Sequence, residues 1–410
     1  MITIKDKKDC CGCHACVTVC AKHCITMQED KEGFLYPVVD KGACTDCGLC
    51  EKVCPVIHQD APHEPLSSYI AINRNEEIRL QSSSGGIFTL LAEAIINEGG
   101  VVFGARFDAE WNVIHAWTNT VEGLAAFRGS KYVQSRIGDT YREAREFLKQ
   151  GRKVLFSGTP CQIAGLNKYL RKEYDNLLTV DFICHGVPSP GVWRRYLDEL
   201  REELRAERGV GKNSVSSSID ELPVITGISF RDKTNGWKKY GFRLRYTAFE
   251  AASNTVSAPA IKEEKEFLQP FEENPFMQGF LADIYLRPSC YDCPAKSGKS
   301  GSDITIADAW GIGEIDPTFD DDKGCGLVLI KTEKGQECYS SYDTISKKIR
   351  FDEIIKYNTA YYKCPVPHPN RKCFFKGYEN IVDISKYLRP TLSRRIIIKI
   401  KSYIRRIFIK

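Results

Sequence analysis

Apolar and polar side chains alternate between helical and strand periods along residues 82–205. In the segment 84–96, apolar residues stand at 87, 90, 91, 94 and 95, the spacing of one helix face, with Ser84 as the predicted N-cap and Gly99 near the helix end. Thr140 and Glu143 have the spacing of a capping box, which predicts a second helix that ends at Gly151. Further helices are predicted over 162–169 and 191–205, and strands over 101–107, 111–118, 153–157 and 177–184.

The repeated order of strand, tight turn and helix predicts an α/β layer whose strands form one sheet. Strands at 225–231 and 240–246 flank Asn235-Gly236 and predict a hairpin arm, and further strands are expected at 304–307 and 327–331. The segment 209–220 is polar and rich in serine, which predicts a loop. At 410 residues, the chain is long enough for two to three domains.

Positive charge is concentrated at the C-terminal end. The chain has 58 basic and 53 acidic residues, and seven of the basic ones lie in 394–410, where no acidic residue occurs. As a helix, this segment has one apolar face and cations on the others, which is typical of a helix on an anionic membrane surface. The alternative is a terminal helix that docks on this protein or on a partner subunit. The rest of the chain has no basic patch with interleaved aromatic residues, so we expect no nucleic-acid partner.

The 18 cysteines are distributed unevenly, since ten of them precede residue 55. This indicates an N-terminal cofactor module held by its metal rather than by a large core. Residues 1–6 have no apolar signal-peptide core, and no apolar stretch reaches transmembrane length, so we expect a cytoplasmic protein with reduced thiols. If the basic helix binds lipid, the protein is peripheral on the inner face of the membrane.

Two runs of cysteines carry the strongest chemical signal in the chain. The second run has the spacing C-x2-C-x2-C-x3-C-P of a bacterial ferredoxin, and the first run repeats the cysteine spacing. Since the fourth cysteine of each run ligates the other cluster, the spacing assigns two cubane clusters. Cluster one is assigned to Cys10, Cys13, Cys16 and Cys54, and cluster two to Cys44, Cys47, Cys50 and Cys20. Cys11 and Cys24 are surplus, and the alternatives are zinc pairs or, less in keeping with a long chain, a disulfide framework.

Four later cysteines stand where a site can form. Cys161 lies at a predicted strand-to-helix turn, Cys184 ends the next predicted strand, and Cys290 and Cys293 form a C-x2-C pair. The ends of parallel strands meet at one edge of a sheet, where ligands usually bind. We therefore predict a third cluster from these four residues, with separate, inert buried cysteines as the alternative.

Several motifs occur in an order that resembles the coenzyme F420 hydrogenase/dehydrogenase beta-subunit family over roughly residues 1–330. They are the cysteine-rich start, Ser84-Gly85-Gly86, the segments 129–134 and 158–162, Cys184-His185-Gly186, the C-x2-C pair and the segment 303–311. The resemblance implies a non-covalent flavin, FAD, beside a cubane cluster held by Cys161, Cys184, Cys290 and Cys293. It places the flavin against Ser84, Gly85, Gly86, Ser130, Lys131, Tyr132, Gln134, Thr159 and Gln162.

Small residues at a helix start leave backbone N–H groups for a phosphate, although without the resemblance plain helix capping is the favoured interpretation of Ser84-Gly85-Gly86. Within this family, a chain with a full two-cluster module at its N-terminal end resembles the stand-alone bacterial members more than the archaeal subunits. The expected fold is a two-cluster ferredoxin module (1–58), an α/β flavin domain with a mixed sheet (66–150 and 151–332), and an extension (333–410) that ends in the basic amphipathic helix.

The expected function is that of an iron–sulfur flavoprotein oxidoreductase. It would relay single electrons through three clusters to a flavin that reduces or oxidises an organic acceptor such as a deazaflavin, with a redox protein or a small molecule as partner. One alternative is a non-catalytic electron-transfer or assembly subunit docked to a membrane or partner, linked to surface-polysaccharide synthesis. Radical chemistry on S-adenosylmethionine would need a C-x3-C-x2-C run, which the sequence lacks.

Overall fold

An eight-stranded mixed sheet forms the centre of the computed structural model, which describes residues 1–206, 223–249, 262–377, 381 and 383–388. The strand order is β13-β3-β12-β11-β7-β6-β4-β5, and the four adjacent strands β11, β7, β6 and β4 run parallel. The strands are β3 (Ser67–Ile72), β4 (Val101–Phe107), β5 (Val113–Thr118), β6 (Val154–Ser157), β7 (Leu177–Phe182), β11 (Ile304–Asp308), β12 (Gly326–Ile330) and β13 (Ile345–Ile349). The predicted α/β layer with a mixed sheet is therefore present.

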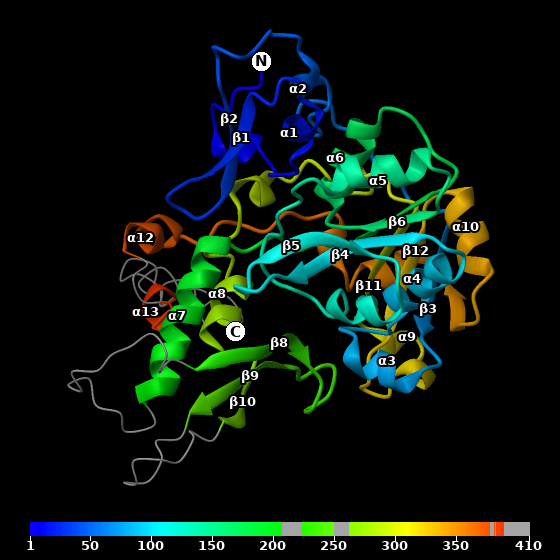
Figure 1. Cartoon of the computed structure of the whole chain (residues 1–410). Coiled ribbons are helices and arrows are strands. Elements are labelled where there is room, and N and C mark those ends of the chain that lie inside the picture. The colour runs from blue at the N-terminus through cyan, green and yellow to red at the C-terminus, as the bar shows by residue number, and fades with distance from the viewer. Residues whose placement is uncertain (207–222, 250–261, 378–380, 382, 389–410) are drawn as a thin grey trace, which may run out of the picture.

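Helices cover both faces of this sheet (Figure 1). Within β6, Phe156 packs with α5 (Thr140–Lys149) and α6 (Pro160–Leu170), whereas Leu155 packs with α4 (Ile87–Asn97) and α10 (Glu333–Ser340) on the opposite face. Successive side chains of a strand point to opposite faces, so a strand covered on both sides is apolar throughout. This is why the central strands read as continuous hydrophobic runs.

The N-terminal module lies at one end of the molecule, over α5 and α6 (Figure 1). It contains the 3-10 helix η1 (Lys7–Asp9), α1 (Ala15–Val19), the antiparallel pair β1 (Ile25–Glu29) and β2 (Leu35–Val39), and α2 (Leu49–Lys52). Ala15 and Val53 are fully buried in the same apolar cluster as α5 and α6. The ferredoxin-like region is therefore docked on the sheet domain rather than attached only by its linker.

The predicted hairpin arm is present at the other end of the molecule. It is formed by β8 (Val224–Asp232) and β9 (Gly241–Phe249), and a third antiparallel strand, β10 (Lys262–Pro270), was not predicted because its alternating charges hide a strand pattern. The arm packs on α7 (Pro190–Ala206) and α8 (Pro275–Leu281) through an aromatic core that includes Trp193, Phe230 and Phe242.

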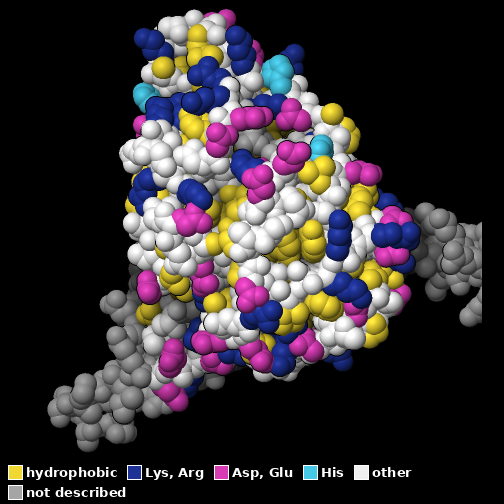
Figure 2. All heavy atoms as spheres, turned by 90° about the vertical axis from the view of Figure 1, so that its right-hand side faces the viewer, with side chains coloured by type: hydrophobic (Ala, Val, Ile, Leu, Met, Phe, Trp, Pro, Cys, Tyr) yellow, Lys and Arg dark blue, Asp and Glu magenta, His cyan; other side chains and the backbone are white. Residues whose placement is uncertain are grey.

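The remaining elements are short. They are α3 (Glu76–Gln81), α9 (Ile312–Ile315), α11 (Phe351–Ile355), α12 (Arg371–Lys376), α13 (Ser385–Leu388), η2 (Glu122–Ala126), η4 (Pro288–Asp292), η5 (Pro317–Phe319) and η6 (Thr359–Tyr361). None of the helices in the described ranges is both long and apolar enough to cross a bilayer. Basic and acidic side chains are interspersed over the face shown in Figure 2, in keeping with the near-neutral body of the sequence.

Two predicted helix starts are wrong. The N-cap of α4 is Gly86, at φ +81°, because the preceding loop lies flat on the sheet and the Ser84 hydroxyl donates to the Cys325 carbonyl at 2.7 Å. The N-cap of α5 is Asp139, and Thr140 sits in the first turn, where its hydroxyl donates to the Ile137 carbonyl at 2.8 Å. In both cases the hydroxyl bonds to a carbonyl and not to an orphan N–H of the helix.

The predicted region bounds remain predictions, although strands from all three regions after residue 66 share the one sheet, in which β3 lies between β12 and β13. The predicted loop at 209–220 and the predicted basic helix at 394–410 lie outside the described residues.

Candidate redox site

In the N-terminal module, the thiols assigned to cluster one influence one another's pKa values. Burial raises the pKa of the Cys16 thiol, and the neighbouring thiols of Cys10 and Cys54 raise it further. The strongest single influence on the pKa of Cys13 is a hydrogen bond with Cys11, which lowers it, but burial and the thiols of Cys16 and Cys54 together outweigh it, so the pKa is raised. These mutual effects mean that the four thiols lie near one another, but Cys50 acts on Cys16 and Cys54 as well, so the division of the ligands between two clusters stays a prediction.

The second group is looser. Cys20, Cys44 and Cys50 belong to one small cluster of packed side chains, and Cys47 is exposed. The surplus Cys24 lies 3.4 Å from Cys20, sulfur to sulfur. Within the described ranges, no three cysteine, histidine or acidic side chains lie close enough together to hold a single metal ion. Each group of cysteines is therefore a set of thiols that lie near one another, without metal-binding geometry.

The four later cysteines also come together. Burial raises the pKa of Cys184 well above its ordinary value, and the thiols of Cys290, Cys161 and Cys293 raise it further, while Lys296 opposes them. Burial and the thiols of Cys293 and Cys161 raise the pKa of Cys290 to about 12. Cys161 lies in the first turn of α6 and not in the preceding turn, and Cys184 lies two residues beyond β7. Because β6 and β7 are parallel neighbours, both cysteines reach the same sheet edge.

The thiol of Cys11 lies between Cys13 of the ferredoxin-like module and Cys161 of the four-cysteine group. The pKa of the buried Cys11 thiol is raised by its hydrogen bond with Cys13 and by burial, while a hydrogen bond with Cys161 opposes the rise. Cys13 itself lies against α6, since a Cβ added at Gly165 would be 3.0 Å from its sulfur. The ferredoxin-like module therefore meets the four-cysteine group directly, without an intervening layer of protein.

A cavity of about 520 Å³, lined in part by Cys184, opens at the carboxyl ends of the parallel strands. Of the nine residues predicted to contact a flavin, eight line this cavity: Ser84, Gly85, Gly86, Ser130, Lys131, Tyr132, Thr159 and Gln162. Gln134 does not line it; its amide bonds to the Cys11 carbonyl at 3.0 Å and to Arg287 at 2.8 Å. Thr159 and Gln162 also cap α6, because the Gln162 side chain accepts from the Thr159 N–H at 2.9 Å.

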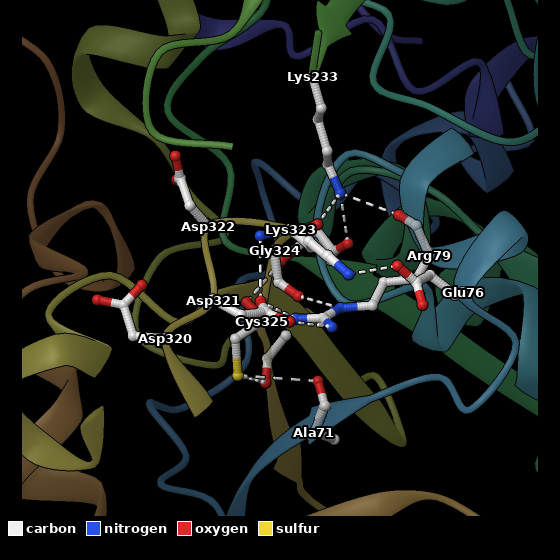
Figure 3. Close-up of polar contacts among 12 residues, drawn as sticks. Ala71, Glu76, Arg79, Lys233, Asp320, Asp321, Asp322, Lys323, Gly324 and Cys325 are labelled. Atoms are coloured by element: carbon white, nitrogen blue, oxygen red, sulfur yellow. Dashed lines mark hydrogen bonds and ion pairs between the residues drawn. The ribbon is translucent and has the colours of Figure 1, made fainter. Parts of the chain in front are cut away.

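The loop 82–86 forms one wall of the cavity and is anchored from behind by Lys233 of the arm. The Lys233 ammonium donates to the carbonyls of Arg79, Ser84 and Lys323 at 2.9, 2.8 and 2.7 Å (Figure 3). Burial lowers the pKa of Lys233 to about 7, but three carbonyl acceptors require three N–H donors, so we treat it as protonated. A Cβ at Gly85 would lie 2.4 Å from the Ala71 carbonyl, so only glycine fits this approach to the sheet.

Two basic side chains lie in the cavity wall, His115 buried and Lys131 partly buried. The Lys131 ammonium donates to the carbonyls of Arg128 and Gly129, and burial lowers its pKa to about 7. His115 bonds through Nε2 to the Ser157 carbonyl at 3.0 Å, and burial lowers its pKa to about 4. In the part of the chain that the structure describes, His115 Nδ1 has no hydrogen-bond partner. His115 was not predicted, because nothing near it in the sequence marks it.

The arm supplies the opposite wall. Arg231 pairs with Asp308 at 2.9 Å, and the Trp237 indole donates to the same carboxylate at 3.0 Å. Trp237 also stacks on Trp310, with 4.7 Å between ring centroids. Asp308 ends β11, one residue beyond the predicted strand 304–307, and Arg231 was missed since its partner lies 77 residues away.

Two family models match parts of this chain, and three known proteins are similar to it. Residues 151–354 match the family described as the C terminus of the coenzyme F420 hydrogenase/dehydrogenase beta subunit, and residues 9–57 match the "4Fe-4S dicluster domain". The F subunit of the F(420)H(2) dehydrogenase of Methanosarcina mazei is 26% identical over 186 residues, which are 43% of this chain and 53% of that protein. "Ferredoxin 7Fe" of Hydrogenibacillus schlegelii is 42% identical over 64 residues, 15% of this chain and 76% of that protein.

A solved structure of the F420-reducing [NiFe] hydrogenase complex from Methanosarcina barkeri has a chain with a TM-score of 0.43 and 16% identity, covering 79% of this chain and 91% of that one. The match to the first curated relative spans about half of that relative's length. The chain belongs to the coenzyme F420 hydrogenase/dehydrogenase beta-subunit family and carries an N-terminal 4Fe-4S dicluster domain. It is thus an iron–sulfur protein of the electron-transfer class.

Proposed function

We propose that this protein is an iron–sulfur flavoprotein oxidoreductase that exchanges electrons between its N-terminal clusters and an organic acceptor, such as a deazaflavin, at the cavity. The observation that carries the proposal is the position of the four-cysteine group. It lies between the ferredoxin-like module, through the contact of Cys161 with Cys11, and the cavity, which Cys184 lines. Redox centres that exchange electrons must lie close to one another, as these three sites do.

The residues present fit a third cubane cluster and a flavin. Four thiols on three separate segments match the Cys₄ donor set of a [4Fe–4S] cluster, and the Val187 N–H, 3.4 Å from the Cys290 sulfur, supplies a hydrogen bond of the kind that tunes such clusters. The cavity has a volume within the range of cofactor sites and combines aromatic rings with a few buried polar groups. When bound, clusters move single electrons and a flavin converts between one- and two-electron chemistry.

The chain's own residues then bind and orient the flavin. The N-terminus of α4 faces the cavity at Gly86 and offers backbone N–H groups to a phosphate. Lys131 places a cation in the wall, where a bound anion would raise its pKa back toward the ordinary value. Arg231 and Asp308 are a closed ion pair, so they shape the cavity without adding net charge.

Anaerobic reconstitution followed by iron, sulfide and flavin analysis tests the proposal. Three cubane clusters and one flavin require about twelve irons and one isoalloxazine per chain. Cys184→Ser is expected to lower the iron content to about eight. Cys338→Ser is the matched control, since Cys338 is a partly buried cysteine that bonds only to Tyr342. About eight irons in the unaltered protein would remove the third cluster from the proposal.

The alternative function, an electron-transfer subunit without catalysis of its own, is favoured by the name of the Methanosarcina mazei relative, which is a subunit. Flavin content separates the two. A reconstituted protein with full iron and sulfide but no bound flavin would support the alternative, and one flavin per chain would support the oxidoreductase.

A further inference from the structure

Arg287 lies at the junction of the ferredoxin-like module and the sheet domain and is fully buried. Its guanidinium donates to the carbonyls of Cys10 and Leu35 at 2.8 and 2.9 Å, to the Gln134 side chain at 2.8 Å, and to the Cys10 sulfur at 3.5 Å. Three residues later in the chain comes Cys290, a member of the four-cysteine group. Arg287 therefore stands between a ligand of cluster one and a ligand of the proposed third cluster.

The loop of cluster one is shaped to accept this side chain. Gly12 has φ +71°, and a Cβ added there would lie 2.9 Å from the guanidinium carbon of Arg287. The ring of Tyr36 covers the guanidinium, with its centroid 4.3 Å away. Gly12 lets the backbone approach the guanidinium closely, and the ring of Tyr36 stacks on the guanidinium. Together they hold the charge in one position.

Arg287 differs from the other buried arginines in its counter-ion. Arg79 pairs with Asp321 and Arg231 with Asp308. For Arg287, no carboxylate lies within ion-pair distance among the residues that the structure describes; its partners are carbonyls, an amide and a thiol. A buried cation without an anion is strongly unfavourable. A thiolate-ligated cluster carries net negative charge, so a cluster bound through Cys10 supplies the missing anion.

We propose that Arg287 sets the reduction potential of cluster one by holding a permanent positive charge and an N–H donor against the Cys10 sulfur. Adding an electron makes a cluster more negative, so a nearby cation and a hydrogen bond to sulfur both favour the reduced form and raise the potential. Because a guanidinium does not titrate in proteins, this contribution is independent of pH. The proposal rests on the proposed function only for the cluster bound through Cys10, and not for the flavin or the acceptor.

The test is a potentiometric titration of the reconstituted full chain, followed by electron paramagnetic resonance. Arg287→Gln is expected to move the midpoint of cluster one to a more negative value by about 59 mV, which for one electron is a tenfold change in the oxidised-to-reduced ratio. Cluster two serves as the internal reference, since none of its ligands contacts Arg287, and its midpoint should stay unchanged. Iron content, measured on the same samples, separates a shifted cluster from a lost one.

An arginine–glutamate ion pair at the same junction provides the control. Arg371 pairs with Glu32 at 2.5 Å and donates to the Leu286 carbonyl, with no thiol among its contacts. The double variant Arg371→Gln/Glu32→Gln removes a docking contact and no net charge, so it should leave the midpoints in place. Equal shifts in this control would mean that docking, and not the charge of Arg287, sets the potential.

Arg287→Lys keeps the charge but loses the forked donor, and a smaller shift is expected. Unchanged midpoints in Arg287→Gln with full iron content overturn the proposal. So does loss of iron in both Arg287 variants while the control retains it, because Arg287 would then be needed only for assembly.

Discussion

At the scale of single residues, His115, which lines the cavity, has a buried ring nitrogen without a hydrogen-bond partner among the described residues. The Ser157 carbonyl can only accept, so His115 carries its proton on Nε2 and presents Nδ1 as an acceptor. His115→Phe keeps the stacking on Phe156 but removes this acceptor. Since one hydrogen bond contributes about 0.5–1.5 kcal/mol, we expect the dissociation constant of the flavin to rise about 2- to 10-fold. Fluorescence titration of the cluster-loaded protein measures it, and an unchanged constant would show that Nδ1 does not face the flavin.

The same histidine gives stability a defined pH dependence. Its pKa is about 4 when folded, against 6.5 ordinarily, because burial disfavours the imidazolium. Between these values the unfolded chain binds more protons, so stability falls as the pH falls through this window and is unaffected above it. At pH 5, the cost relative to pH 7 is about 2 kcal/mol. Thermal unfolding of the wild type and His115→Phe at both pH values should show a larger loss in the wild type; equal losses would contradict the assignment.

At the scale of elements, the arm holds the loop 82–86 through one side chain. Lys233→Met removes the donor to three carbonyls, of which the Ser84 carbonyl belongs to the loop. We expect a loss of about 2–4 kcal/mol in unfolding free energy and weaker flavin binding, because the buried carbonyls lose their partner. Lys238→Met is the control on the same arm: Lys238 is half exposed and pairs with Asp320 at 2.6 Å, a contact that contributes at most about 1 kcal/mol. Equal thermal midpoints for the two variants would show that Lys233 is no anchor.

Local patterns in the sequence were sufficient for the central strands and α7, whereas the assignment of cysteines to clusters stays a prediction. The apolar runs of β4, β6 and β7 are continuous because both faces are covered, and cysteine spacing is a property of one loop. The loop 82–86 and the segment 130–132 were expected near a flavin only because their motifs resemble those of the family, and both line the cavity.

The missed residues depend on contacts between distant segments. Arg231 reaches Asp308 only because the arm folds over the sheet, and His115 reaches the cavity from an edge strand. Gln134 was expected at the flavin but lies against Cys11 and Arg287, because the chain after Val133 turns toward the docked module. Such placements follow from how the elements pack, which no local period encodes.

At the scale of the whole molecule, the ferredoxin-like module has little core of its own. Its two small apolar clusters contain Ile2, Ile25, Phe34 and Tyr36 as buried residues, together with three cysteines. Its helices are only four and five residues long. The sheet domain has, in contrast, large cores on both faces. We infer that bound clusters, more than an apolar core within the module, stabilise residues 1–58.

Cluster loss should therefore unfold the module before the sheet domain. Two exposed cysteines make a matched pair for the test: Cys47 is an assigned ligand of cluster two, and Cys373 belongs to none of the three groups. Cys47→Ser alters no packed side chain but removes a ligand, so we expect at least about tenfold faster proteolysis within residues 1–58, since cleavage follows the population of the open form. Cys373→Ser should be cut at the wild-type rate. Limited proteolysis with mass spectrometry of the fragments measures both, and first cleavage within the central strands would mean that the module is stable without its metal.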